Sequence, residues 1–185
     1  ERLRVSRLAM DVLSASQGAV GARILEEARA QQVFFGPIYF RKESEPYMTM
    51  ALAGRGDEGG AVVAETNLKF IWELVSALRV GKAGYAYVVD ANGRLIAHPD
   101  ISLVLQKTEM VGLPQVVSGL RQLTMAKEAE ATAQVGRSLA GSRVLSAHAS
   151  IESLSWLVFV EVPFDEAYDP LLSSALRAVG LLILG

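Results

Sequence analysis

Two short runs of apolar residues, 85–89 and 95–97, flank the mostly polar residues 90–94, and this pattern predicts a β-hairpin near the middle of the chain. The dipeptide Asn92-Gly93 lies where the chain must reverse, because Gly readily adopts the positive φ that such turns require. The return strand should end at His98, since Pro99 has no N–H to donate to a neighbouring strand. One face of the first strand carries large residues that suit a half-buried sheet: Tyr85, Tyr87 and Val89.

Before the hairpin, the pattern predicts a strand, a helix, three strands and a second helix. Ser14 or Ser16 can cap the first helix, and Asn67 can cap the second. Gly36-Pro37 interrupts the first of the three strands, which predicts an edge strand or a bulge. The expected ranges are 1–10 (strand), 14–31 (helix), 33–40, 47–53 and 60–66 (strands) and 67–78 (helix).

After the hairpin, the pattern predicts one helix, three strands and a C-terminal helix. Pro114 suits the first turn of the helix that follows the hairpin. The run after Arg177 is apolar, but it has only about half of the ~20 residues that span a bilayer. A truncated transmembrane helix explains it better than an ordinary buried helix. The expected ranges are 113–127 (helix), 128–135, 143–150 and 156–162 (strands), 136–141 (turn) and 165–185 (helix).

The order of elements repeats on either side of Gly81 and Gly84, which predicts two α+β modules with antiparallel sheets flanked by helices. The 185 residues have a formal charge of −2 and no long basic run, which disfavours nucleic-acid binding. There is no Cys, so disulfides, thiolate catalysis and Cys-based zinc sites are excluded. No signal peptide follows Glu1-Arg2-Leu3-Arg4, and the chain is expected to be a fragment.

The short patterns in the sequence that could suggest chemistry have simpler explanations. Residues 54–59 match G-x-G-x-x-G and contain Arg-Gly-Asp, but a predicted strand follows them, so a hairpin loop is preferred over a phosphate site. His98 and His148 could form a metal site with Asp90 or Asp100, but no ligand spacing supports it. No G-x-S-x-G elbow is present. We therefore expect no catalytic residue, no metal and no cofactor.

Two stretches of the sequence resemble the Cache domain, the PAS-like sensor module found outside the membrane in bacterial receptors. The first reads GKAGYAYVVDANGRLIAHPDISLVL and contains the hairpin with its AHPD corner. The second reads RVLSAHASIESLSWLVFVEVPFDEAYDPL and resembles the last two Cache strands with the helix that leads into the membrane. Together they span roughly the C-terminal half. The N-terminal half resembles the membrane-distal module of a double Cache sensor.

The resemblance implies the extracytoplasmic ligand-sensing domain of a bacterial transmembrane receptor, periplasmic and attached to the inner membrane. Its parts would be a partial distal module with a connecting helix (1–80), a proximal module (81–164) and an exit helix with the start of a membrane span (165–185). Such a domain would form a homodimer and signal to a histidine kinase, a cyclase or diguanylate cyclase, or a chemoreceptor rod. The alternative is a structural or protein-interaction module without a small ligand. An enzyme has no support in this segment.

The ligand-binding candidates combine Arg with Tyr. A guanidinium fork binds a carboxylate, and tyrosine hydroxyls orient a small anionic or zwitterionic ligand. The resemblance implies a ligand in the distal module, where the candidates are Arg7, Tyr39, Arg41 and Tyr47. The alternative is that these residues are surface arginines and core tyrosines. The proximal module contains a second set of candidates: Tyr85, Tyr87, Asp90, His98, His148 and Trp156. These residues either line a pocket or belong to the core, where the Tyr and Trp side chains would be large core residues with a polar tip. The Tyr/Arg/Trp pattern of amino-acid-binding members of the family is not found.

Overall fold

The computed structural model describes residues 11–12, 18–42, 45–54, 61–125 and 133–168. The chain divides into two compact units, residues 1–71 and 72–185. The boundary expected near residue 81 remains a prediction. The strand expected at 1–10, most of the 54–59 loop and all but the beginning of the C-terminal helix lie outside the described residues.

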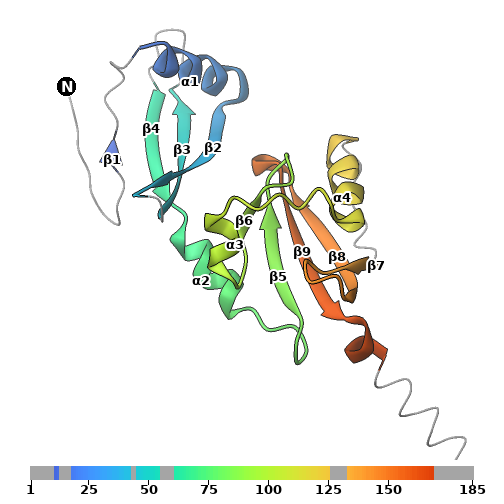
Figure 1. Ribbon diagram of the computed structural model, residues 1–185. Helices are drawn as coiled ribbons and strands as arrows, with labels where there is room; N and C mark the ends of the chain where they lie inside the picture. The colour runs from blue at the N-terminus through green and yellow to red at the C-terminus, as the bar shows by residue number, and fades with distance from the viewer. Residues whose placement is uncertain (1–10, 13–17, 43–44, 55–60, 126–132, 169–185) are drawn as a thin grey trace, which may run out of the picture. The chain divides into compact units, whose positions relative to one another are not determined.

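Unit 1 is a four-stranded antiparallel sheet with one helix packed against it (Figure 1). The strand order is β1-β4-β3-β2. Helix α1 contacts β2 and β3 above all, and its buried Ala28 allows a close approach to the sheet. The elements are β1 (Asp11–Val12), α1 (Gly18–Gln31), β2 (Val33–Arg41), β3 (Glu45–Ala53) and β4 (Ala61–Asn67).

Strand β2 confirms the effect expected of Gly36-Pro37. It lies at one edge of the sheet, and its register with β3 shifts between Phe35 and Ile38. Proline lacks an N–H for the ladder, so the chain passes it as an irregularity on an edge strand. Beyond the shift, Tyr39 pairs directly with Tyr47.

Helix α2 (Lys69–Ala77) carries the chain from unit 1 into unit 2. Its predicted cap is confirmed, since the amide of Lys69 donates to Oδ1 of Asn67 at 2.8 Å. The buried residues of the helix include Trp72, whose indole Nε1 donates to the carbonyl oxygen of Ile96 at 2.7 Å. This hydrogen bond ties α2 to the return strand of the central hairpin.

Unit 2 is a five-stranded antiparallel sheet with strand order β6-β5-β9-β8-β7. Helix α4 contacts β7 and β8, and α3 contacts β6 (Figure 1). Residues 164–168, directly after β9, are helical. The elements are β5 (Tyr85–Val89), β6 (Leu95–Ala97), α3 (Ile101–Leu105), α4 (Pro114–Thr124), β7 (Gln134–Arg137), β8 (Arg143–Ile151), a 3₁₀ turn (Glu152–Leu154) and β9 (Trp156–Pro163).

The central hairpin is confirmed, with β5 and β6 paired through one register shift. The positive φ falls on Gly93, at +77°, rather than on Asn92. Oδ1 of Asp90 accepts hydrogen bonds from the amides of Asn92 and Arg94, at 2.8 and 2.9 Å, and so closes the turn. Strand β6 ends at Ala97, one residue before His98. Pro114 occupies the first turn of α4 as expected.

Strand β7 differs from the prediction. It comprises Gln134–Arg137, so two residues expected in a turn belong to the strand. The reversal begins only at Ser138, whose amide donates to the carbonyl of Ser142 at 2.9 Å. Among the described strands, this edge strand pairs only with β8, and the turn sets its register. In the part of the chain that the structure describes, no helix has the length and apolar character needed to cross a membrane.

Candidate functional site

The Glu65 cluster, which comprises Tyr39, Arg41, Tyr47 and Glu65, brings together three of the four candidates in unit 1. The rings of Tyr39 and Tyr47 stack across β2 and β3 with centroids 6.3 Å apart. The guanidinium carbon of Arg41 lies 4.7 Å from the centroid of the Tyr47 ring. Glu65, on β4, accepts a hydrogen bond from the Tyr39 hydroxyl at Oε1 and one from Arg41 Nη2 at Oε2. Arg7 lies outside the described residues.

The members of this cluster differ strongly in burial. The side chain of Glu65 is only 7% exposed, whereas that of Arg41 is 39% exposed. Burial and the hydrogen bond to Glu65 raise the pKa of Tyr39, so its hydroxyl stays a donor at neutral pH. The cluster therefore pairs a buried carboxylate with a half-exposed cation, and an aromatic ring lies against that cation.

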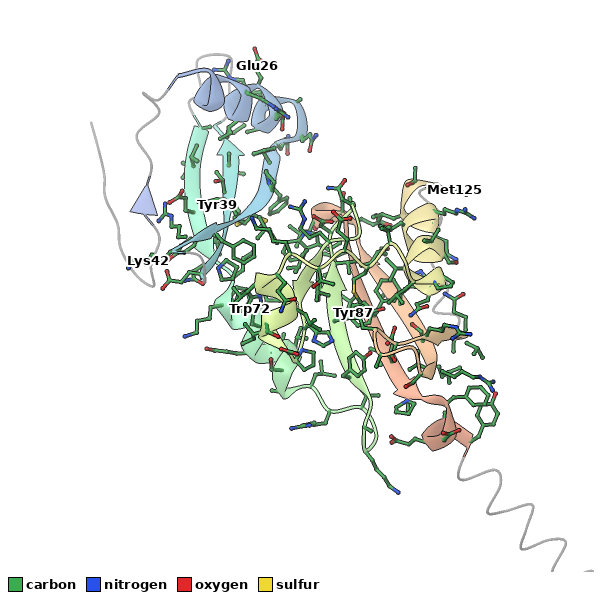
Figure 2. The ribbon with its side chains drawn as sticks, in the orientation of Figure 1. Glu26, Tyr39, Lys42, Trp72, Tyr87 and Met125 are labelled. Atoms are coloured by element: carbon green, nitrogen blue, oxygen red, sulfur yellow. The ribbon has the colours of Figure 1, made fainter. Side chains whose placement is uncertain are left out.

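The Glu161 cluster, which comprises Tyr85, Tyr87, Gln115 and Glu161, lies in the core of unit 2. Glu161, on β9, is only 1% exposed. Its Oε2 accepts from the Tyr85 hydroxyl at 2.7 Å. Its Oε1 accepts from the Tyr87 hydroxyl at 2.7 Å and from Gln115 Nε2 at 2.9 Å. Figure 2 shows Tyr87 on β5, among the side chains of the sheet.

Burial raises the pKa of both Tyr85 and Tyr87, and the Glu161 carboxylate adds to the effect. Both hydroxyls therefore remain donors throughout the physiological range. Gln115 is also bound to β7, donating to the carbonyl of Arg137 at 2.6 Å. With three donors on one carboxylate, the cluster satisfies a charge that would otherwise be costly to bury.

His98 adjoins this cluster. Its ring lies 5.4 Å from that of Tyr85, edge to face, and 6.3 Å from that of Tyr87. Its Nδ1 accepts a hydrogen bond from the amide of Asp100 at 2.9 Å. Burial lowers the pKa of His98, so the ring is neutral at pH 7 with its proton on Nε2. Asp100 in turn caps α3 through the amide of Ser102.

The other proximal candidates lie apart from this group. Asp90 is used by the hairpin turn, as described above. His148, on β8, faces Gln122 of α4, with its Nε2 2.9 Å from Oε1. Trp156 is the first residue of β9, five positions before Glu161, and it is buried. The structure thus brings together Tyr85, Tyr87 and His98 but not Asp90, His148 or Trp156. Among the described residues, no group of three or more His, Cys, Asp or Glu side chains could hold a metal ion.

An open cavity of about 450 Å³ lies in unit 2 beside Tyr85. It is bounded by the β7–β8 turn and by the first residues after β9. Its polar lining comes from Ser138, Ser142, Arg143 and Asp165. Tyr85 is the one residue that both lines this cavity and bonds to Glu161. Through Tyr85, whose ring lies 6.2 Å from that of Tyr87 and 5.4 Å from that of His98, this cavity adjoins two of the proximal candidates.

Sequence reasoning missed Glu65, Gln115 and Glu161. A signal for Glu161 was present in the strand alternation. Glu161 is in phase with Leu157 and Phe159, the buried face of β9. An acid in the phase of a buried face requires donors, and the tyrosines of the adjacent strand supply them. Gln115 had no comparable signal, since a glutamine in the first turn of a helix is ordinarily exposed.

The chain belongs to the Cache domain family, because the family model dCache_1, described as a Cache domain, matches residues 12–171. The resemblance drawn from the hairpin and the last strands is thereby confirmed. The methyl-accepting chemotaxis protein PctB of Pseudomonas aeruginosa is 27% identical over 142 residues, which cover 68% of this chain and 20% of that protein. The chain spans between 12% and 20% of the length of the curated relatives that it matches.

Solved structures share the fold. The extracellular domain of mmHK1S-Z3, described as a candidate histidine kinase, has a TM-score of 0.67 at 15% identity, covering 88% of this chain and 59% of that one. The ligand-binding domain of the P. aeruginosa amino acid chemoreceptor PctB in complex with L-Gln has a TM-score of 0.56 at 21% identity, covering 92% and 68%. The two structures are thus an extracellular domain of a histidine kinase and a ligand-binding domain of a chemoreceptor, and the fold of this chain is the α+β, antiparallel Cache fold expected from the sequence.

Proposed function

We propose that this chain is the extracytoplasmic ligand-sensing domain of a bacterial transmembrane receptor and that it binds a small zwitterionic or anionic molecule at the Glu65 cluster. The observation that carries the proposal is the pairing of buried Glu65 with half-exposed Arg41 beside two stacked tyrosines. Membership of the Cache family supports a sensory role.

The cluster offers complementary groups to a zwitterion. Arg41 is long enough to swing from Glu65 toward an incoming carboxylate, for which its planar fork is suited. An ammonium group of the ligand would then replace the guanidinium on Glu65 and keep that buried carboxylate paired. The hydroxyl of Tyr39 would fix the orientation. The complex of PctB with L-Gln makes amino acids the first class of ligand to test.

The sequence candidates in unit 2 form a second, separate proposal. Tyr87 and His98 would take part in a proximal site reached past Tyr85 from the open cavity. Asp90 would contribute only by holding the hairpin turn that positions β5. This arrangement requires Glu161 to exchange one of its present donors for a ligand group.

Signalling would proceed by a shift in population. A ligand that binds one arrangement of the domain better than another moves the equilibrium by its differential affinity, and equal affinity would move nothing. In the proposed receptor, a homodimer anchored in the inner membrane would pass this shift through the segment after β9 to a kinase, cyclase or chemoreceptor output. The two modules would be residues 1–80 and 81–164.

The alternative, a protein-interaction module, has one observation in its favour. A shallow apolar groove on α4 is lined by Val111, Val117, Leu120 and Met125, among others. Met125, labelled at the end of α4 in Figure 2, is 72% exposed. Exposed apolar surface of this kind is typical of contact sites between proteins.

Calorimetric titration with a panel of amino acids, γ-aminobutyrate and dicarboxylates tests the sensor proposal. We expect one compound to bind, and binding to weaken at least tenfold in Arg41→Ala and in Glu65→Gln. Arg23→Ala is the matched control, because Arg23 forms an exposed ion pair with Glu27 at 2.8 Å on α1 of the same unit. A ligand whose affinity is equal in all variants would remove the Glu65 cluster from the site. Absence of binding to the folded protein would favour the interaction module.

A further inference from the structure

Glu166 joins the two ends of unit 2. It lies in the helical residues 164–168 that follow β9. Its Oε2 accepts a hydrogen bond from the amide of Ala83 at 2.9 Å, and its Oε1 accepts one from the amide of Lys82. The partners are more than 80 residues apart in sequence. A carboxylate bound by two successive backbone amides forms charge-assisted hydrogen bonds, which are stronger than neutral ones.

The conformation of the loop at Gly81 fits this contact. Gly81 has a φ of +64°, and a Cβ built on it would lie 2.2 Å from Oε1 of Glu166. A side chain at position 81 would therefore strain the backbone and displace the carboxylate. The glycine allows two amides to point at one acid.

The loop and Glu166 lie at the two ends of unit 2, and these positions suggest what the contact does. The loop at 81–84 follows α2, in which the chain passes from unit 1 to unit 2. Glu166 is the third residue of the helical segment that follows β9. We propose that Glu166, Lys82 and Ala83 form a latch that couples the loop entering unit 2 to the helical segment leaving it, so that a displacement of the loop is passed to that segment.

The latch serves the proposed sensory function, but its test uses no ligand. Failure of the latch and failure of ligand binding are therefore separate results. Hydrogen exchange of the whole chain, followed by NMR, reports the loop side. We expect the amides of Lys82 and Ala83 to exchange at least tenfold faster in Glu166→Ala, with the amides of β5 and β9 unchanged. Glu152→Ala, at an exposed glutamate in the same unit, is the control.

A spin label reports the other side of the latch. The chain has no Cys, so Tyr168→Cys provides a single labelling site in the helical segment. We expect Gly81→Ala, a change confined to the loop, to raise the mobility of this label as much as Glu166→Ala does. Gly141→Ala is the matched control, because Gly141 also has positive φ, +83°, but nothing lies within 4 Å of its added Cβ.

The double variant Gly81→Ala/Glu166→Ala should be no more mobile than either single variant, since each removes the same contact. Unchanged exchange at Lys82 and Ala83 in Glu166→Ala would overturn the contact. Unchanged label mobility in Gly81→Ala, with the exchange result as expected, would overturn the coupling.

Discussion

Tyr85 and Glu161 are direct partners across β5 and β9, and the tyrosine hydroxyl lies 2.7 Å from Oε2 of the carboxylate. With Tyr87 and Gln115, this pair gives the buried Glu161 three neutral donors. Tyr85 and Tyr87 lie on β5 and Gln115 lies on α4, so the Glu161 carboxylate on β9 links these three elements. The charge is buried through hydrogen bonds rather than through a counterion among these partners.

The first prediction concerns the loss of that charge. Glu161→Gln should lower the free energy of unfolding by about 1.5–3 kcal/mol, the contribution typical of hydrogen bonds to a charged group. Glu161→Leu should cost more, because it leaves the buried hydroxyl of Tyr87 without its acceptor and removes one acceptor each from Tyr85 and Gln115. Urea unfolding followed by circular dichroism measures both effects.

Glu152→Gln serves as the matched control for this series, since Glu152 is exposed in the 3₁₀ turn just before β9. Its effect should lie within about 0.5 kcal/mol. If Glu161→Leu were as stable as the native chain, the carboxylate would not be a structural centre of unit 2.

The second prediction separates backbone strain from steric clash at Gly93. This glycine has a φ of +77°, and an added Cβ would lie 2.6 Å from Cγ1 of Val111. Gly141 has a φ of +83° but open space around its Cβ. Gly141→Ala should therefore cost only the ~1–2 kcal/mol of left-handed backbone strain. Gly93→Ala should cost more, and Gly93→Val most of all.

Thermal unfolding of the three variants in one buffer provides the measurement. Equal melting temperatures for Gly93→Ala and Gly141→Ala would show that Val111 moves aside at no cost. A melting temperature of Gly93→Val equal to that of the native chain would refute the role of Gly93 in the turn.

The parts of the fold that could be predicted depend on proline and glycine, whose backbone preferences differ most from those of other residues. Pro99 ends a strand, Pro114 begins a helix, Gly93 turns the hairpin and Gly36-Pro37 disrupts an edge strand. Each follows from the missing N–H of proline or the missing Cβ of glycine. Such rules act within a few residues, so they apply before any tertiary contact is known.

The candidate site depends on pairing between residues far apart in sequence, so it could be predicted only in part. Tyr39, Arg41 and Tyr47 lie close to one another in sequence, and the hairpin brings them together as expected. Glu65 is 26 residues from Tyr39, and Glu161 is 74 residues from Tyr87. Which tyrosine faces which acid is set by the register between strands, and a single residue of slip would put them on opposite faces.

The third prediction concerns Trp72, which ties α2 to β6. Its indole donates to the carbonyl of Ile96 at 2.7 Å in a buried position. Trp72→Phe keeps most of the apolar volume but leaves this carbonyl without that donor, which should cost about 1–3 kcal/mol. Urea unfolding measures the loss. Leu74→Ala, at an exposed position of the same helix, should cost less than Trp72→Phe, and the reverse order would contradict this role for Trp72.

The last prediction concerns pH. Burial lowers the pKa of His98 and outweighs Asp100 and Glu161, which act to raise it. In the unfolded chain the histidine has its ordinary pKa of 6.5. Below that pH the unfolded state binds the proton more readily than the folded state. The contribution of His98 to stability is therefore present above about pH 6.5 and is lost as the pH falls, by at most ~1.4 kcal/mol per pH unit for one proton.

His98→Asn isolates this effect. The amide oxygen of Asn can accept the hydrogen bond from the amide of Asp100 that Nδ1 now accepts, but it does not titrate. The free energy of unfolding should fall less steeply between pH 7.5 and 5.5 in this variant than in the native chain. His148, whose pKa is also lowered by burial, remains in both proteins and contributes the same slope to each. An identical slope in the two proteins would show that His98 takes up its proton equally well when folded.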